Sequence, residues 1–431
     1  MQEAKPPQSD IHNKALLVGI ELPQTTHFFA TQSSLQELKE LAQSAGFTPV
    51  AEIQVRLKGI KAATLLGKGN LEKIKNLASI HGVSSIIFDE ELKPLQHKNL
   101  TEFFSEQFYI LDRTALILDI FAKRAHTQEG KLQVQLARYT YLLPRLTRRH
   151  TDLAQQTGGR HGGVGLRGPG ETQLEIERRS IKERMQGLKK EIEKIRRNRG
   201  KLRQKRREKG LFTVALAGYT NAGKSTLLNA LAKASVSTES KLFCTLDPTT
   251  RRLKLPGGSY ILLTDTVGFI AKLPHELITA FHATFEEITE ADLILHVIDS
   301  SDPQLEAKKQ IVEQELNRLA LHDVPVVEVY NKIDLLKPES KIAINTKGKA
   351  LYISALKGYG LAELRYRLEE EHHRTMLTVK LRLPYRDIKL LALLRSKAVI
   401  KEEITDDKFI LIKAYVHRAI FERIKSFITT E

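Results

Sequence analysis

Residues 212–234 read FTVALAGYTNAGKSTLLNALAKA, and everything else in the chain is interpreted from this stretch. The apolar run Phe212 to Ala217 predicts a strand, and Ser225 to Ala234 predicts a helix. Between them, Gly218 to Ser225 matches the pattern GxxxxGK[ST], whose glycines let backbone N–H groups face phosphate at a helix N-terminus. We expect Lys224 to lie along the β- and γ-phosphates and the Ser225 hydroxyl to bind Mg²⁺. The stretch therefore predicts an α/β nucleoside triphosphatase domain.

Two further motifs follow strand-like runs and identify the base as guanine. Asp265-Thr266-Val267-Gly268 follows the run 259–264, so its carboxylate can reach the Mg²⁺ shell and its glycine N–H the γ-phosphate. In Asn331-Lys332-Ile333-Asp334, the Asp334 carboxylate can accept from N1–H and the exocyclic amine of guanine, which adenine does not offer. Losing two hydrogen bonds to a charged group, about 1.5–3 kcal/mol each, favours GTP by roughly 10² to 10⁴-fold. In this order the motifs predict a GTPase.

A switch loop between the first two motifs must supply a hydroxyl to the metal. Thr245 is the first candidate in the run 243–250, and Thr249 is the second. Ser354-Ala355-Leu356 follows another strand-like run and is similar to a loop whose backbone contacts guanine O6. The predicted metal ligands are Ser225, Thr245 and Asp265, the last directly or through water. The predicted nucleotide-binding residues are Gly218, Tyr219, Thr220, Asn221, Ala222, Gly223, Lys224, Ser225, Thr226, Phe243, Cys244, Thr245, Leu246, Asp247, Asp265, Thr266, Val267, Gly268, Asn331, Lys332, Ile333, Asp334, Ser354, Ala355 and Leu356.

The residue after the second motif is Phe269, where many GTPases have a glutamine that orients the attacking water. A phenyl ring cannot do this, so no catalytic residue is assigned and we expect slow hydrolysis by the isolated chain. Another residue, a bound partner, or a monovalent cation near Asn221 would supply the missing group. Alternatively, the amide of Asn221 only stabilises the loop.

Composition indicates a cytoplasmic protein of about three domains. The 431 residues include one cysteine, which excludes an intramolecular disulfide framework. The start of the chain, Met1 to Asp10, lacks the apolar core of a secretory signal, and no run approaches 18 apolar residues. We expect a monomer without a membrane span, and a peripheral membrane association stays open. The net charge of +17 favours a polyanionic partner.

The segment before the GTPase motifs divides into a small α/β domain, 1–125, and a helical region, 126–210. Alternating strand and helix patterns predict strands at 15–21, 50–57 and 83–88 and helices at 33–45 and 70–81. Leu174, Ile181, Leu188, Ile195 and Leu202 recur every seven residues, and a similar seam starts at Gly130. The two seams predict an antiparallel helical hairpin, here called the arm, with a loop at its tip.

Basic residues of the arm are candidates for contact with RNA. Residues 171–210 contain 16 lysines and arginines against 7 glutamates, which gives +9. The loop at 158–170 has seven glycines, whose exposed N–H groups can bind phosphate; the alternative is a plain linker. The predicted RNA-binding residues are Arg160, His161, Arg167, Arg196, Arg197, Arg199, Lys205, Arg206 and Arg207.

After the GTPase domain, 211–372, a small α+β domain occupies 373–431. Strands are expected at 378–383, 399–405 and 409–416, and helices at 387–396 and 418–427. The predicted fold is thus α/β: a P-loop GTPase domain preceded by a small α/β domain with a long antiparallel hairpin and followed by a small α+β domain.

The chain resembles the HflX GTPases. The resemblance runs through LDRTALILDIF (111–121), GPGETQLE (168–175), GYTNAGKST (218–226), LDPTT (246–250) and DTVGFI (265–270). It implies a factor that hydrolyses GTP, binds the large (50S) ribosomal subunit and points its arm at ribosomal RNA near the peptidyl-transferase centre. It also implies that stalled ribosomes are split into subunits under stress. Cys244 departs from the small alanine usual in the family, and the C-terminal part matches more loosely.

Two readings of other classes stay open. One is an RNA-remodelling or ribosome-assembly chaperone whose N-terminal domain holds a second nucleotide site. The other is a protein-signalling switch without a nucleic acid partner, in which the basic arm is only solvated. Nucleotide hydrolysis by a chain lacking residues 211–431 would support the first.

Overall fold

The computed structural model describes residues 13–21, 30–146, 173–208, 210–232, 242–274, 282–319, 321, 324–336, 350–406, 408–416 and 418–429. The chain divides into two compact units. The first, here called the N-terminal unit, consists of residues 1–195 with two later segments, 240–247 and 270–283. The second, the C-terminal unit, consists of 196–239, 248–269 and 284–431. The two later segments of the N-terminal unit flank the second GTPase motif in sequence, so the units do not follow the domain boundaries expected from the sequence.

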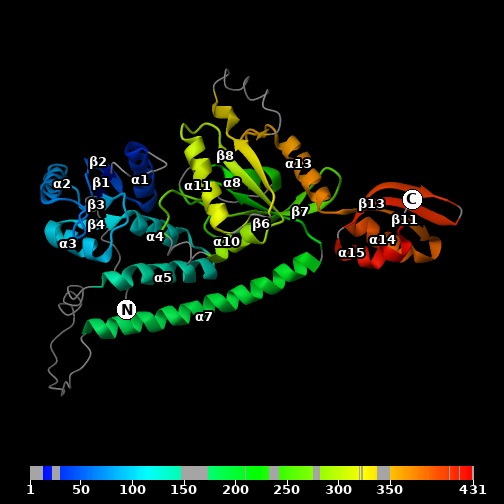
Figure 1. The fold of residues 1–431 in the computed structure, drawn as a ribbon, viewed down its shortest axis with the longest axis horizontal. Coiled ribbons are helices and arrows are strands. Elements are labelled where there is room, and N and C mark those ends of the chain that lie inside the picture. Colours follow the sequence, from blue (N-terminus) through cyan, green and yellow to red (C-terminus); the bar gives the residue numbers. More distant parts are fainter. Residues whose placement is uncertain are drawn as a thin grey trace, which may run out of the picture. The chain divides into compact units, whose positions relative to one another are not determined.

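The N-terminal unit is built on a four-stranded parallel sheet in the order β2-β1-β3-β4 (Figure 1). Its strands are β1 (Lys14–Glu21), β2 (Thr48–Arg56), β3 (Ser85–Phe88) and β4 (Tyr109–Asp112). Its helices are α1 (Thr31–Ala45), α2 (Lys68–Ile80), α3 (Pro94–Phe104), α4 (Arg113–Arg124) and α5 (Gln128–Leu142). The all-apolar centre of β1, Ala15 to Val18, is fully buried because a parallel sheet is covered on both faces.

The GTPase part of the C-terminal unit is a six-stranded sheet in the order β10-β9-β8-β5-β7-β6, in which only the edge strand β6 runs antiparallel. Its strands are β5 (Thr213–Ala217), β6 (Thr249–Lys254), β7 (Tyr260–Asp265), β8 (Leu293–Asp299), β9 (Val326–Asn331) and β10 (Leu351–Tyr352). Its helices are α8 (Lys224–Ala232), α10 (His282–Thr289), α11 (Leu305–Arg318) and α13 (Leu361–Arg374). His282 and Ala283, the first residues of α10, belong to the N-terminal unit.

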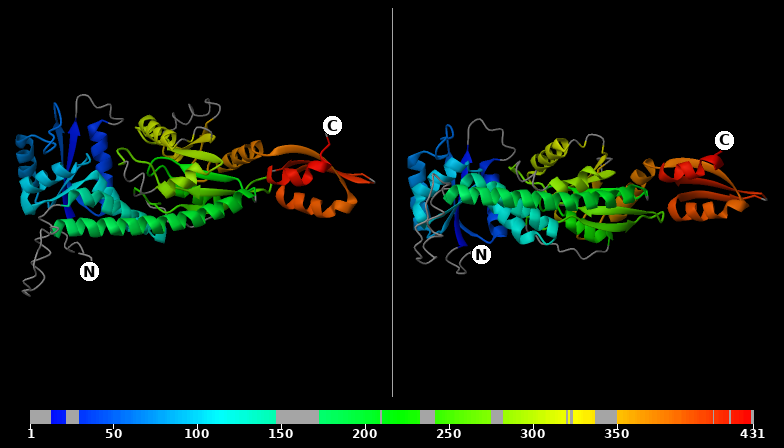
Figure 2. Two further views of the ribbon diagram at one scale, coloured as in Figure 1. Left: turned by 60° about the horizontal axis from the view of Figure 1, so that its bottom comes forward. Right: turned by 90° about the horizontal axis from the view of Figure 1, so that it is seen from below.

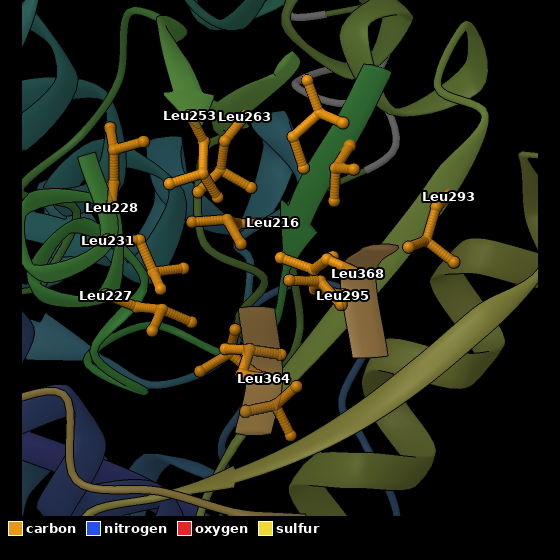
Figure 3. Packing of buried hydrophobic residues seen from close by; sticks show 14 of the residues in the cluster. Leu216, Leu227, Leu228, Leu231, Leu253, Leu263, Leu293, Leu295, Leu364 and Leu368 are labelled. Carbon is orange, nitrogen blue, oxygen red and sulfur yellow. The ribbon is translucent and has the colours of Figure 1, made fainter. Parts of the chain in front are cut away.

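A leucine-rich core fixes α8 and α13 against this sheet. Figure 3 shows the side chains of Leu227, Leu228 and Leu231 from α8 gathered with leucines of β5, β6, β7, β8 and α13. Most of these side chains are completely inaccessible to solvent. Since α8 begins at Lys224, this packing also fixes the phosphate loop at its N-terminus.

The C-terminal residues form a three-stranded antiparallel sheet in the order β11-β13-β12, with α14 and α15 packed on its apolar face. These elements are β11 (Leu377–Pro384), α14 (Ile388–Lys397), β12 (Val399–Thr405), β13 (Phe409–Val416) and α15 (Arg418–Ile424).

The long helix α7 (Gln173–Glu208) has 36 residues and is unbroken, as Figure 2 shows. Gly187 and Gly200 lie inside it without ending it. The pairing of α7 with α5 as one antiparallel arm stays a prediction, because the residues between them, 147–172, lie outside the described part of the chain. Within the described residues, no helix is both long enough and apolar enough to cross a membrane.

Candidate functional site

The phosphate loop takes the backbone conformation that its glycines predict. Gly223 has a φ of 93° and Gly218 one of 156°, and a Cβ on either residue would collide with Asn331 or with the Val297 carbonyl, respectively. Asn221 also has a positive φ, 61°, which asparagine tolerates better than most residues. The loop follows β5 directly and ends where α8 begins, so backbone N–H groups and the positive end of the helix dipole are placed for an anion.

Lys224 and Thr220 supply side chains to this loop. Lys224 is buried, and its Nζ donates to the carbonyls of Gly218 (3.1 Å) and Tyr219 (2.8 Å), which holds the ammonium group over the loop. Among the described residues, the buried Thr220 Oγ1 has no hydrogen-bond partner. A buried hydroxyl in that state normally has a ligand or water to bond. Both side chains therefore fit a phosphate ligand.

Two of the three predicted metal ligands meet in the structure. Ser225 Oγ donates to Asp265 Oδ2 at 2.6 Å, and Asp265 is completely buried at the end of β7. A hydroxyl and a carboxylate at this distance are the hard oxygen donors that Mg²⁺ prefers. The residues present therefore fit the ion, and Ser225 and Asp265 stay its predicted protein ligands.

Phe269 is hydrogen-bonded to the phosphate loop through its backbone, and Gly268 lies close against the same loop. Phe269 N donates to the Gly218 carbonyl at 3.1 Å, and Thr220 N donates to the Phe269 carbonyl at 2.8 Å. A Cβ on Gly268 would lie 2.9 Å from the Thr220 Cα and 3.0 Å from the Lys224 Nζ. The Phe269 ring is 2% exposed and stacks on Phe285 with a centroid distance of 5.5 Å. Phe269 is thus a packing residue, not a group that faces a water.

The guanine motif is tied to the phosphate loop by Asn331. Its Nδ2 donates to the Ala222 carbonyl at 3.0 Å, and its Oδ1 accepts from Ala355 N at 3.0 Å. Asp334 accepts from Ser354 Oγ at 2.6 Å, which orients the carboxylate that is predicted to read the base. The structure therefore brings together the phosphate loop, the guanine motif 331–334 and the segment 354–356.

Some residues near the site had no recognisable sequence signal. One is Asp299, whose Oδ2 is paired at 2.7 Å with the Nζ of Lys332, a residue of the guanine motif that has a φ of 65°. Lys308 lies 5.2 Å from the ring centroid of Tyr219. His296 is buried on β8; burial, with lesser effects of Lys309 and Lys224, lowers its pKa to about 4, so it is neutral at pH 7. Each is an isolated polar residue in its own segment, so only the fold shows its position.

The third predicted metal ligand, Thr245 of the switch loop, is not grouped with the other two in one unit. Thr245, Phe243 and Leu246 lie in a segment, 240–247, that belongs to the N-terminal unit, whereas Ser225 and Asp265 belong to the other unit. Phe243 packs edge-to-face on Phe121 at 4.7 Å. The structure does not bring Thr245 together with the other two predicted metal ligands within one unit, so its role stays a prediction.

The Asp247 carboxylate has a role that the sequence did not indicate. Its Oδ2 accepts from the backbone N–H groups of His126 (2.9 Å) and Thr127 (2.8 Å), and its Oδ1 accepts from the Thr127 hydroxyl. These groups stand at the N-terminus of α5. Asp247 thus stabilises the start of that helix from a distant part of the chain.

The basic residues of α7 are partly paired with acidic residues of α10. Arg196 pairs with Glu286, and Arg206 Nη1 lies 3.9 Å from Glu287 Oε2. Arg197 is exposed and Arg199 is half-buried. Arg160, His161 and Arg167 lie outside the described residues, as do the side chains of Lys205 and Arg207. These ion pairs reduce the net positive charge of α7, and the contact of its basic residues with RNA stays a prediction.

Three family models match consecutive parts of the chain. The family described as "GTP-binding GTPase N-terminal" matches residues 32–122, and "GTP-binding GTPase Middle Region" matches 124–206. The family described as "50S ribosome-binding GTPase" matches 213–332, which contains the phosphate loop, the predicted Mg²⁺ ligands Ser225 and Asp265, and the start of the guanine motif.

Relatives named GTPase HflX align over most of the chain. The protein of Caldanaerobacter subterraneus is 44% identical over 397 residues, which cover 92% of this chain and 90% of the relative. The Escherichia coli protein is 39% identical, with 88% and 90% covered. Among solved structures, a GTP-binding protein of Sulfolobus solfataricus in complex with GDP is 23% identical, with a TM-score of 0.41 over 84% of this chain and 99% of that chain. Together with the nucleotide site, the relatives show that the chain is a GTPase and belongs to the HflX family.

Proposed function

We propose that this GTPase binds the large (50S) ribosomal subunit and dissociates stalled ribosomes under stress, with the bound nucleotide controlling its affinity. The observation that carries the proposal is the match of residues 213–332, which hold the assembled phosphate loop, to the 50S ribosome-binding GTPase family. The net charge of +17 supports a partner rich in phosphate.

In the proposed mechanism, the phosphate loop and Lys224 bind the triphosphate. Asp334, whose carboxylate is oriented by the Ser354 hydroxyl, selects guanine. Ser225 and Asp265 would hold Mg²⁺, with Thr245 completing the set in the GTP state. When bound there, Mg²⁺ supplies electrostatic stabilisation of the phosphate charge. Gly268 precedes Phe269, whose backbone is hydrogen-bonded to the phosphate loop. The Gly268 N–H would donate to the γ-phosphate, and it would lose this hydrogen bond when GTP is hydrolysed.

Hydrolysis by the isolated chain is proposed to be slow. Phe269 is packed on Phe285 and cannot turn toward a water without leaving the core. The ribosomal subunit, or a monovalent cation near Asn221, would supply the missing group. The rate would then depend on the working partner.

The arm is proposed to contact ribosomal RNA. Its glycine-rich segment, 158–170, and the basic residues Arg197 and Arg199 of α7 are the candidate contacts. Nucleotide-dependent binding would place these residues on the ribosome only in the GTP state. The protein is proposed to act as a monomer in the cytoplasm.

The alternative of a second nucleotide site gains no support from the N-terminal sheet. Ligands of open parallel sheets bind at the carboxyl ends of the strands. After β3 and β4 that edge carries the carboxylates of Asp89, Glu90 and Asp112, which repel phosphate. Two described cations at this edge form ion pairs with carboxylates of the same unit: Arg113 pairs with Asp89, and Lys272 pairs with Asp89 and Glu90.

The test is GTP hydrolysis by the purified chain at moderate salt, with and without large ribosomal subunits, with Lys224→Ala as the inactive control. Strong stimulation by the subunit is expected. Sucrose-gradient analysis of stalled ribosomes incubated with the chain and GTP would then show subunits accumulating. If the subunit neither stimulates hydrolysis nor co-sediments with the chain, the proposal is contradicted and the protein-signalling reading is favoured.

A further inference from the structure

A groove of about 800 Å³ lies at the edge of the GTPase sheet that β6 forms. Its walls are the end of α8, the edge strand β6 with the turn that follows it and the first residue of β7, and the first two turns of α13. These elements are labelled in Figure 1. No residue of the phosphate loop or of the guanine motif lines it. The groove is therefore a site that the GTPase reaction does not use.

The lining combines cations and aromatic rings on an apolar floor. Arg252, Lys254 and Arg365 supply the positive charge, and Tyr260 and Tyr366 supply the rings. Of the twelve lining residues, none is acidic. Within the part of the chain that the structure describes, none of the three cations is paired with a carboxylate. An excess of three positive charges in one concave surface attracts an anion.

The register of the sheet places these side chains together. Lys254 lies opposite Tyr260 and Arg252 opposite Leu262 in the antiparallel β6–β7 pair, so Arg252, Lys254 and Tyr260 share one face. The Arg252 guanidinium lies 3.7 Å from the centroid of the Tyr260 ring. Tyr260 is 39% exposed and Tyr366 60% exposed. Two rings thus remain accessible to a planar ligand.

The walls are fastened to one another before any ligand binds. Arg365 Nη2 donates to the Leu231 carbonyl at 2.7 Å, which joins α13 to the end of α8. Gly257 N donates to Glu369 Oε1 at 2.7 Å, which joins the β6–β7 turn to α13. A groove held in this way needs little reorganisation on binding.

We propose that this groove binds an unpaired segment of RNA, with a base stacked on Tyr366 or Tyr260 and phosphates on Arg252, Lys254 and Arg365. Rings that stack bases beside cations that follow the backbone are the usual means of binding single-stranded nucleic acid. Three cations, two on β6 and one on α13, exceed the need of one free nucleotide, and an acidic peptide would not use the exposed rings. The inference requires neither ribosome splitting nor GTP hydrolysis.

The test uses the full chain saturated with GDP and a fluorescein-labelled 12-nucleotide oligoadenylate in fluorescence anisotropy. Tyr366→Ser is expected to weaken binding by about tenfold, the loss typical of one stacked base. Tyr109→Ser removes a tyrosine of equal exposure, 62%, from the N-terminal sheet and should leave the affinity unchanged. Lys254→Gln should reduce the slope of log affinity against log salt by about 0.7.

A second measurement locates the RNA, since the arm also carries basic residues. Photo-crosslinking of the same oligonucleotide with 4-thiouridine substitutions should label peptides that contain residues 252–260 or 361–366. Wild-type affinity in both groove variants, with no crosslink there, would overturn the inference. Competition by AMP as strong as that by the oligonucleotide would also overturn it in favour of a free nucleotide. Displacement by oligoglutamate of equal charge would indicate an acidic protein partner instead.

Discussion

Asp247 accepts a hydrogen bond from the backbone N–H of Thr127 at 2.8 Å, across 120 residues of sequence. Thr127 is itself the N-cap of α5, because its hydroxyl accepts from Gly130 N. The absence of a side chain at Gly130 makes room for this contact, because a Cβ there would collide with the Asp247 carboxylate. The switch loop is thus attached to a helix of the N-terminal unit through one carboxylate, only two residues after the predicted metal ligand Thr245.

Asp247→Ala should release the start of α5. A lost capping interaction costs about 0.5–2 kcal/mol, so amide hydrogen exchange at residues 126–131 should accelerate by roughly 2- to 30-fold. Asp119→Ala is the control, since Asp119 makes an exposed ion pair with Arg138 in the same unit and should not change these amides. Unchanged exchange in Asp247→Ala would show that the contact does not stabilise the helix.

Lys224→Ala should abolish tight binding of the triphosphate. The ammonium group is the buried charge of the loop, and its replacement removes charge-assisted hydrogen bonds of about 1.5–3 kcal/mol each, roughly a 10- to 100-fold loss for one bond. Titration with a fluorescent GTP analogue measures the effect, and Lys201→Ala on α7 is the matched control. Retention of wild-type GTP affinity would contradict the assignment of the loop.

Asp334→Asn should shift the preference from guanine toward xanthine nucleotides. An amide can donate to the xanthine oxygen at the position where guanine carries its amine. Competition between GTP and XTP measures the shift. Ser354→Ala, which removes the hydroxyl that orients Asp334 and accepts from Lys357 N, should weaken GTP binding without the change in base preference. Guanine selectivity that survives Asp334→Asn would overturn the role of this residue.

The motifs were predictable because each is contiguous in sequence. Asp265 ends a strand, and the glycines of the phosphate loop and Asp334 follow strands. The strand expected at 409–416 occupies those residues. The strands expected at 15–21 and 399–405 were also placed to within a residue of β1 and β12. Local periodicity and turn chemistry carry this information.

What could not be predicted depends on pairs of residues that are far apart. Asp247 and Thr127 are 120 residues apart, and Lys272 and Asp89 are 183 apart. Each partner resembles an ordinary surface residue in its own segment, and no local pattern marks a carboxylate that stabilises a distant helix. For the same reason the groove beside Tyr366 had no sequence signal, since its walls come from three separate segments.

Phe269→Gln should not accelerate hydrolysis by the isolated chain, although glutamine is common at this position in other GTPases. The backbone of residue 269 is fixed to the phosphate loop and its side chain is directed into the core against Phe285. Replacing a buried phenyl ring should instead destabilise the GTPase domain by about 3 kcal/mol or more. Phe269→Leu is the conservative control, and single-turnover hydrolysis with thermal unfolding gives both readouts. Faster hydrolysis in Phe269→Gln would show that the side chain can reach the water.

The stability of the N-terminal unit should fall in acid because of Asp89. Burial opposes its ionisation, but Arg113 and Lys272 outweigh this effect and lower the pKa of Asp89 below its usual value. A carboxyl group with a lowered folded-state pKa contributes stability that is present above its unfolded pKa, about 3.9, and is lost as the pH falls through the folded value. Lys272 Nζ lies 2.5 Å from Asp89 Oδ2, and Arg113 Nη1 lies 2.8 Å from Oδ1, so protonation of Asp89 removes one of the partner charges of each cation; Lys272 keeps Glu90 and Arg113 keeps Glu37.

The measurement is hydrogen exchange of the β3 amides, residues 85–88, between pH 5 and pH 3, corrected for the intrinsic exchange rate. Wild-type protection should decrease below about pH 4, where the Asp89 contribution begins to be lost. Asp89→Asn should already be less protected at pH 5 and should show a weaker pH dependence, because its side chain does not titrate. Asp119→Asn, whose carboxylate is exposed, should follow the wild type. An identical pH dependence in Asp89→Asn and the wild type would mean that other carboxylates determine the acid sensitivity of this unit.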